Sequence, residues 1–114
     1  MITGTEEKRR LPRIKLKTPL RYQIRGLPEL NETVSDNVSL GGIGFINDRF
    51  IAPKTLVMLE INVLSRVLRP LGKIAWAASL PRSDNYRIGV EFLELDRGEK
   101  NYLTDYVDMQ MGRL

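Results

Sequence analysis

The sequence predicts a small all-β barrel followed by a C-terminal helix, and three observations lead to this fold class. Apolar and polar residues alternate along short segments, beginning at Ile14, as in half-buried strands. Turn-forming residues separate these segments at short intervals, which is typical of barrels. After Asp96 the apolar residues change to helical spacing. The chain has 114 residues, which is enough for one domain with one core.

The composition is that of a small globular protein, with 42% hydrophobic and 28% charged residues. The longest apolar runs are too short to span a bilayer, and no apolar segment precedes the first cations, so we expect a cytoplasmic protein without membrane insertion. Cysteine and histidine are both absent, which removes disulfides, thiolate chemistry and the commonest general base and metal ligand. We therefore expect no enzyme, no metal and no cofactor.

The positive charge is concentrated at the N-terminal end. The chain carries a net charge of +4, but residues 1–25 hold eight Lys or Arg against two Glu, which leaves the remainder slightly acidic. Four of these cations fall within Lys8-Arg9-Arg10-Leu11-Pro12-Arg13. Guanidinium groups match phosphates and guanine edges, so this run is a candidate anion site; a solvated basic tail is the alternative. A local anionic partner is favoured over a long nucleic acid.

The first strand leads into a hairpin that places the basic run. Alternation continues from Ile14 to Ile24, a turn follows near Arg25 and Gly26, and an extended segment resumes at Glu32. Antiparallel pairing around this turn sets residues opposite each other when their numbers sum to about fifty. Arg13 is therefore expected beside Asn37.

The segment after the hairpin combines polar residues with glycines. Asn37 and Ser39 stand at alternate positions, which predicts side chains on the same side of an extended chain, and both can read a base edge. Gly41, Gly42 and Gly44 indicate tight turning or close approach by another group, and Gly42 can leave room for a flat ligand. A plain turn without ligand is the alternative.

The remaining segments complete the barrel and the helix. Strands are predicted at Leu56–Val63, at Val67–Ala78 with a bulge or break at Pro70, and at Tyr86–Phe92. Trp76 is expected in the core, with an aromatic stacking platform as the alternative. Asp96 and Glu99 form a helix N-terminal capping pattern. Leu103, Tyr106, Val107 and Gln110 fall at helical spacing, and the apolar stripe of this helix packs onto the barrel or faces a partner; we favour packing.

Four ordered motifs in this chain resemble PilZ domains over roughly residues 6–110. Arg9 and Arg13 form an RxxxR element, and Asn37, Ser39 and Gly42 form a [D/N]xSxxG element. The segments Leu71–Trp76 and Tyr86–Phe92 are similar to two later strands of that family.

The resemblance implies a six-stranded antiparallel barrel that acts as a receptor for the bacterial second messenger cyclic di-GMP. It divides the chain into a flexible arm (1–13), a barrel (14–95) and a helix packed on it (96–114). It assigns Arg9 and Arg13 to phosphates and guanine edges, Asn37 and Ser39 to a guanine edge, and Gly42 to close approach. Arg10 often joins such a site. Lys8, Asp36 and Gly41 are further candidates, because a shifted register would give Asp36 the role of Asn37.

Ligand binding is then expected to change the conformation of the protein and signal to a protein partner that the sequence does not identify. Two other functions stay open. Some PilZ-like domains bind no nucleotide and act through protein contacts, which is favoured if Arg9 or Arg13 is tied to carboxylates. A small barrel can also bind single-stranded nucleic acid, which requires exposed aromatics among the cations.

Overall fold

The computed structural model describes residues 11–113 and contains eight strands and one helix in that range. The strands are β1 (Ile14–Lys15), β2 (Pro19–Ile24), β3 (Asn31–Ser39), β4 (Gly42–Asn47), β5 (Leu56–Val63), β6 (Arg66–Leu68), β7 (Leu71–Ser79) and β8 (Tyr86–Glu94). Helix α2 (Arg97–Gln110) follows the last strand.

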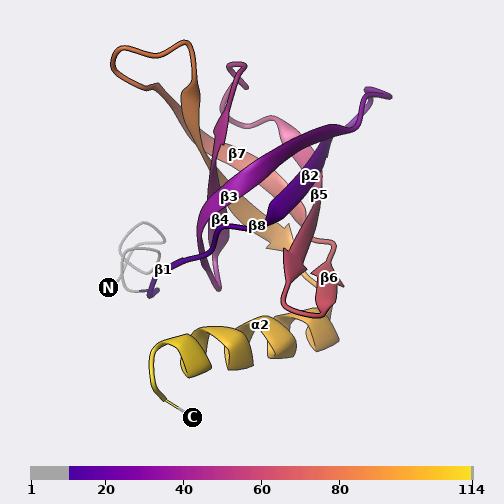
Figure 1. Ribbon diagram of the computed structural model, residues 1–114. Coiled ribbons are helices and arrows are strands. Elements are labelled where there is room, and N and C mark those ends of the chain that lie inside the picture. Colours follow the sequence, from indigo (N-terminus) through magenta and orange to yellow (C-terminus); the bar gives the residue numbers. More distant parts are fainter. Residues whose placement is uncertain (1–10, 114) are drawn as a thin grey trace, which may run out of the picture.

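The strands form a closed antiparallel barrel (Figure 1). The pairing order is β3-β2-β5-β7-β8-β4, and β4 returns to pair with β3, so six strands close the ring. The two short strands are additions to it: β1 pairs with β3, and β6 pairs with β5. The predicted six-stranded barrel with a C-terminal helix is confirmed.

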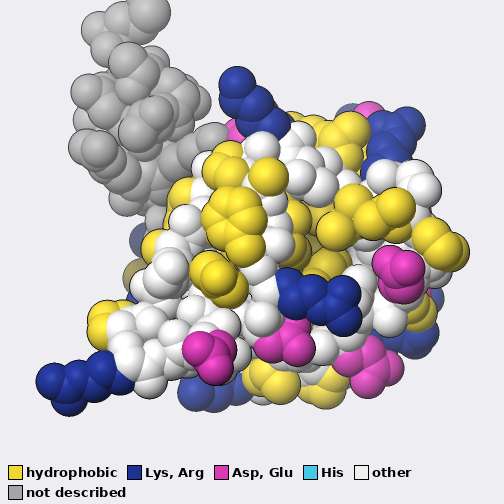
Figure 2. Space-filling view, turned by 90° about the horizontal axis from the view of Figure 1, so that it is seen from above, with side chains coloured by type: hydrophobic (Ala, Val, Ile, Leu, Met, Phe, Trp, Pro, Cys, Tyr) yellow, Lys and Arg dark blue, Asp and Glu magenta, His cyan; other side chains and the backbone are white. Residues whose placement is uncertain are grey.

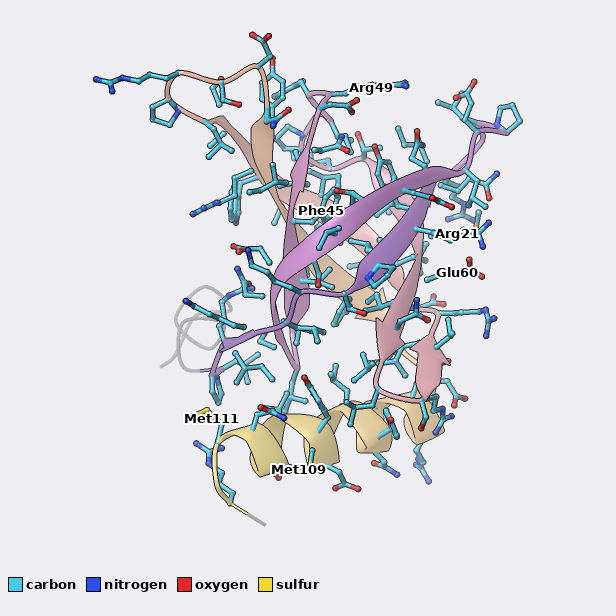
Figure 3. The ribbon with its side chains drawn as sticks, viewed as in Figure 1. Arg21, Phe45, Arg49, Glu60, Met109 and Met111 are labelled. Atoms are coloured by element: carbon cyan, nitrogen blue, oxygen red, sulfur yellow. The ribbon has the colours of Figure 1, made fainter. Side chains whose placement is uncertain are left out.

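The core fills the inside of the barrel with aliphatic side chains and a few aromatic ones. Phe45 lies inside it, as Figure 3 shows, and its ring packs 5.5 Å from that of Tyr22. The Tyr22 hydroxyl donates to Asn47 Oδ1 at 3.2 Å. Burial raises the pKa of Tyr22 above its ordinary value, an effect that the hydrogen bond to Asn47 opposes.

The hairpin forms as predicted but with a different register and an interrupted first strand. Ile14 pairs with Val38 and Leu20 with Thr33, two to three positions beyond the predicted register. Gly26 occupies the turn with a φ of +90°, a conformation that favours glycine. The single strand predicted from Ile14 to Ile24 is wrong, because the chain leaves the sheet between β1 and β2.

Helix α2 lies across one end of the barrel (Figure 1). Asp96 is its N-cap, and its Oδ2 accepts from the backbone N–H groups of Gly98 and Glu99. Glu99 does not complete the predicted capping pattern; its Oε1 instead accepts from the backbone N–H of Arg69 at 3.0 Å.

The inner face of α2 supplies Leu103, Tyr106 and Val107 to the hydrophobic core, while Gln110 at the end of the predicted stripe is exposed. Figure 2 looks onto the opposite end of the barrel, where apolar side chains surround a hollow. Within residues 11–113, the helix is neither long nor apolar enough to cross a membrane.

Candidate ligand-binding site

Arg13 lies directly beside Asn37. It precedes β1, and its Nη1 donates a hydrogen bond of 2.6 Å to Asn37 Oδ1 on β3. The predicted juxtaposition is therefore confirmed, although through a different register, and the role of the two residues in binding stays a prediction. Lys8, Arg9 and Arg10 lie outside the described residues.

Ser35 holds the segment that carries Arg13 against β3. Its hydroxyl is almost fully buried, accepts from the Thr18 backbone N–H at 3.1 Å and donates to the carbonyl oxygen of Leu16. These two bonds provide partners for backbone hydrogen-bonding groups at the point where the chain leaves the sheet between β1 and β2. Ser35 was not among the predicted site residues; the available signal is a serine at an inward position of a strand that follows a strand interrupted by a Thr-Pro step.

Asp36 stands at a β-bulge in the middle of the site. Against β4, Ser35 pairs with Phe45 and Asn37 with Gly44, so Asp36 is the extra residue. Asn37 Nδ2 donates to Asp36 Oδ2 at 3.1 Å. Both side chains are half-buried and lie side by side, so the site presents a carboxylate and an amide together. A carboxylate can accept two hydrogen bonds, which suits the donor groups of a guanine.

Ser39 lies on the same side of β3 as Asn37, as predicted, because the register is regular from Asn37 to Ser39 and Val38 between them faces the core, but Ser39 is not accessible. It is 2% exposed, and its Oγ accepts from the backbone N–H of Gly41 at 3.1 Å. The hydroxyl therefore stabilises the turn between β3 and β4. The side chain of Leu11 lies against Gly41 beside this turn, because a Cβ added there would stand 2.8 Å from Leu11 Cδ1.

Gly42 is required by the closure of the barrel. A Cβ at this position would stand under 3.0 Å from the carbonyl oxygen of Val90 on β8, a separation that real Cβ atoms do not show. The residue is buried and faces β8 rather than open space. The sequence interpretation, that Gly42 leaves room for a flat ligand, is corrected: the room is taken by the neighbouring backbone.

Trp76 is on the outer wall of the barrel and not in the core as predicted. Its side chain is 44% exposed and covers Gly89 of the neighbouring strand. A bulge at Ala75 changes the phase of β7, because Ile74 pairs with Val90 and Trp76 with Gly89. A glycine between inward Ile88 and Val90 was the available signal, since a strand glycine often marks a close approach.

The charges around the site suit an anion. Among residues 11–113, Arg13 makes no ion pair with a carboxylate, and the neighbouring Lys15 and Lys17 are exposed. Asp36 is the acidic side chain that these contacts bring to Asn37. No group of His, Cys, Asp or Glu in the described part of the chain could hold a metal ion. The arrangement can bind an anionic ligand with a polar edge.

Together these features define a small antiparallel barrel with a candidate anion-binding site on its outer wall. The PilZ domain family model matches residues 7–109, so the chain belongs to the PilZ domain family. Members of this family are ligand-binding and regulatory modules. A comparison with curated proteins finds no match.

Solved structures share the fold at low sequence identity. The inhibitor of motility MotI/DgrA of Bacillus subtilis is 19% identical with a TM-score of 0.77; the match covers 91% of this chain and 52% of that protein. The chain thus spans about half the length of that relative. The PilZ domain of YcgR from Escherichia coli, solved with c-di-GMP, is 14% identical with a TM-score of 0.71. The match covers 93% of this chain and 92% of that domain.

A tetrameric PilZ domain of Xanthomonas campestris, described as self-assembled through a helical bundle, is 11% identical with a TM-score of 0.70. That match covers 91% of this chain and 90% of the other. These likenesses establish the fold that the sequence motifs predicted.

Proposed function

We propose that this protein is a cyclic di-GMP receptor that signals to a protein partner, without catalytic activity. The observation that carries the proposal is the hydrogen bond between Arg13 and Asn37, because it joins the two halves of the family's binding motif. The hairpin that carries the site also lies within residues 7–109, which the PilZ domain family model matches. The Escherichia coli relative with the same fold was solved with c-di-GMP.

The residues of the site have complementary parts in this proposal. Arg13 pairs with a phosphate or with the O6 and N7 edge of a guanine. Asp36 and Asn37 accept from the donor groups of the same guanine, while Ser39 and Gly41 keep the adjoining turn in place. Arg9, with Arg10 and Lys8 beside it, is assigned to further phosphate or guanine contacts from the segment before the described residues.

Binding requires local contacts to be exchanged, which provides a mechanism for signalling. Asn37 already uses both polar atoms of its amide, one with Arg13 and one with Asp36. A ligand that takes over Arg13 must replace the first of these bonds. Leu11 covers Gly41 two residues before Arg13, so movement of Arg13 changes the contacts of this segment. Residues 1–13 then close over the ligand and form a new surface for the partner.

The expected affinity is micromolar or better. A bidentate contact between Arg and guanine contributes about 1–3 kcal/mol, and micromolar binding requires about 8 kcal/mol. Two or three arginines with the Asp36 and Asn37 pair can supply this free energy. Ordering of the N-terminal segment consumes part of it.

Calorimetric titration with cyclic di-GMP tests the proposal, with GTP and the linear dinucleotide as ligand controls. Arg13→Ala should weaken binding roughly 5- to 150-fold, the range for one lost Arg–guanine contact. Arg25→Ala is the matched control, because it removes the same charge from the opposite end of the hairpin, where Arg25 is exposed. Its affinity should equal that of the wild type.

Hydrogen exchange tests the closing of the N-terminal segment. Amides of residues 6–13 should become protected when cyclic di-GMP is added, and unchanged protection would contradict the closing step. If calorimetry detects no binding of cyclic di-GMP to the wild type, the receptor proposal fails. A PilZ domain that acts through protein contacts alone would then be the remaining function.

A further inference from the structure

A groove of about 1140 Å³ crosses the outer wall of the barrel over four neighbouring strands, which pair in the order β2-β5-β7-β8. One row of register-paired residues runs through it. Gln23 on β2 pairs with Met58 on β5, and Met58 pairs with Leu71 on β7. Leu71 in turn pairs with Glu94 on β8. The row covers three strand spacings, so the groove is about 14 Å long in this direction.

The floor of the groove is apolar although it faces outward. Met58 and Leu93 are each 45% exposed, and Leu30, just before β3, is 48% exposed. Leu93 is the extra residue of a bulge in β8, opposite Leu71 and Gly72. These exposed side chains lie outside the hydrophobic core. Apolar side chains that gather in the open between polar ones mark a surface for another molecule.

A chain of charges runs along one edge of the groove. Arg21 on β2 lies 3.6 Å from Glu60 on β5, and Arg69, just before β7, lies 3.3 Å from the same carboxylate. Figure 3 shows Arg21 and Glu60 beside each other on the outside of the barrel. Arg21 also lies 3.9 Å from Glu32, but that side chain is 78% exposed, and such a contact contributes little in water. Two guanidinium groups thus share one carboxylate, which leaves donors for a further acid.

The geometry determines which kind of partner fits. Along the groove β5 and β7 are each paired on both sides, so neither offers a free edge to an added strand. A small ligand would leave much of its own surface in water, because the floor is open. A helix of about nine or ten residues has the length of the row, and its width of about 10 Å suits a groove between strands.

We propose that this groove docks an amphipathic helix of a partner protein. The apolar stripe of the helix covers Met58 and Leu93, and acidic residues on its flank pair with Arg21 and Arg69. Glu94 stands at the β8 end of the row, where the positive N-terminal end of the helix is favoured. None of the described residues of the candidate ligand site lines the groove, so this inference does not depend on nucleotide binding.

Methyl NMR of the methionines tests docking on the unaltered protein. The chain has four methionines, and Met109 and Met111 on α2 are 48% and 44% exposed, which makes them matched controls for Met58. The probe is a helix-stabilised peptide of about eleven residues, three turns long, with a leucine stripe and glutamate flanks. The same peptide with lysine flanks is the control. The glutamate peptide should shift the Met58 signal, assigned with Met58→Leu, and leave those of Met109 and Met111 unchanged.

Two variants separate the apolar floor from the charged edge, with affinity measured by fluorescence anisotropy of the labelled peptides. Met58→Asp should weaken the glutamate peptide about 10- to 150-fold, the range for one buried methionine, whereas Met109→Asp should not. Arg69→Glu should weaken the glutamate peptide and strengthen the lysine peptide. Misfolding cannot produce that reversal. The Arg69 side chain is 63% exposed, and its backbone N–H makes the bond to Glu99, so the fold does not depend on the guanidinium.

The outcomes are distinguishable. A shift confined to Met58, together with the reversal in Arg69→Glu, establishes the docking surface. Equal binding of the two peptides, equal shifts of Met58, Met109 and Met111, or no binding of the glutamate peptide overturns it. A Met58 signal that moves with protein concentration alone would assign the groove to a second copy and also overturn the proposal. Titration with cyclic di-GMP is a separate measurement and decides only the receptor proposal.

Discussion

Replacement of Gly42 by alanine should destabilise the barrel. The added Cβ would stand under 3.0 Å from the Val90 carbonyl oxygen, so the ends of β4 and β8 must separate. Phe92 donates its backbone N–H to the Gly41 carbonyl at 2.9 Å, and this bond is weakened by the separation. Overpacking costs about 1–3 kcal/mol and one lost hydrogen bond about 1 kcal/mol, which gives about 2–4 kcal/mol. For a domain of this size the melting temperature should fall by about 10 °C.

Urea and thermal unfolding followed by circular dichroism measure this cost. Gly44→Ala is the matched control on the same strand, because the three atoms nearest to its added Cβ belong to the Asn37 side chain, at 3.0 Å or more, and not to the backbone. Its unfolding free energy should change by less than that of Gly42→Ala. A Gly42→Ala protein that unfolds like the wild type but has lost cyclic di-GMP binding would refute the reasoning. Ligand binding, and not closure of the barrel, would then be the reason for a glycine at position 42.

Three other predictions follow from buried contacts. Ser35→Ala leaves the Thr18 N–H and the Leu16 carbonyl without their partner, so it should cost about 2–3 kcal/mol in urea unfolding and also weaken ligand binding through Arg13. Leu103→Ala should cost about 2–5 kcal/mol, because this residue is fully buried; a cost near zero would mean that α2 is dispensable for the core. The raised pKa of Tyr22 contributes stability that is complete below about pH 10 and lost as the pH rises through its folded-state pKa. Tyr22→Phe should lose less stability than the wild type between pH 8 and pH 11 in urea unfolding.

The sequence predicted those parts of the fold that depend on local pattern. The strand at Tyr86–Glu94 and the helix after Asp96 appear where alternation and capping residues placed them, and the chain breaks at Pro70 as predicted. The proximity of Arg13 to Asn37 was predicted from an inexact register. This predicted proximity is found because β1 continues the pairing with β3 after a short interruption. The shift next to Arg13 is two residues, roughly 7 Å along a strand, which an extended arginine side chain can still span.

The sequence did not predict features that depend on contacts between distant strands. The environments of Gly42 and Trp76 both depend on β8. This strand pairs with β4, which carries Gly42, and with β7, which carries Trp76, and it lies far along the chain from Gly42. Alternate spacing placed Ser39 beside Asn37, but accessibility is decided by what packs above each residue. Ser39 makes its bond within the β3–β4 turn, next to Leu11. Such burial has no local signature in a sequence.

The two bulges explain why the candidate site lies on this wall of the barrel. An extra residue in one strand of a pair bends that strand and re-aims its side chains. Asp36 does this in β3, where it places a carboxylate next to the amide of Asn37. Ala75 does it in β7, where it turns Trp76 outward over Gly89. Between them two paired glycines, one on β4 and one on β8, let both side chains lie close to the backbone. The curvature that closes a small barrel thus also places the Asn37 amide and the Trp76 indole on the outer wall.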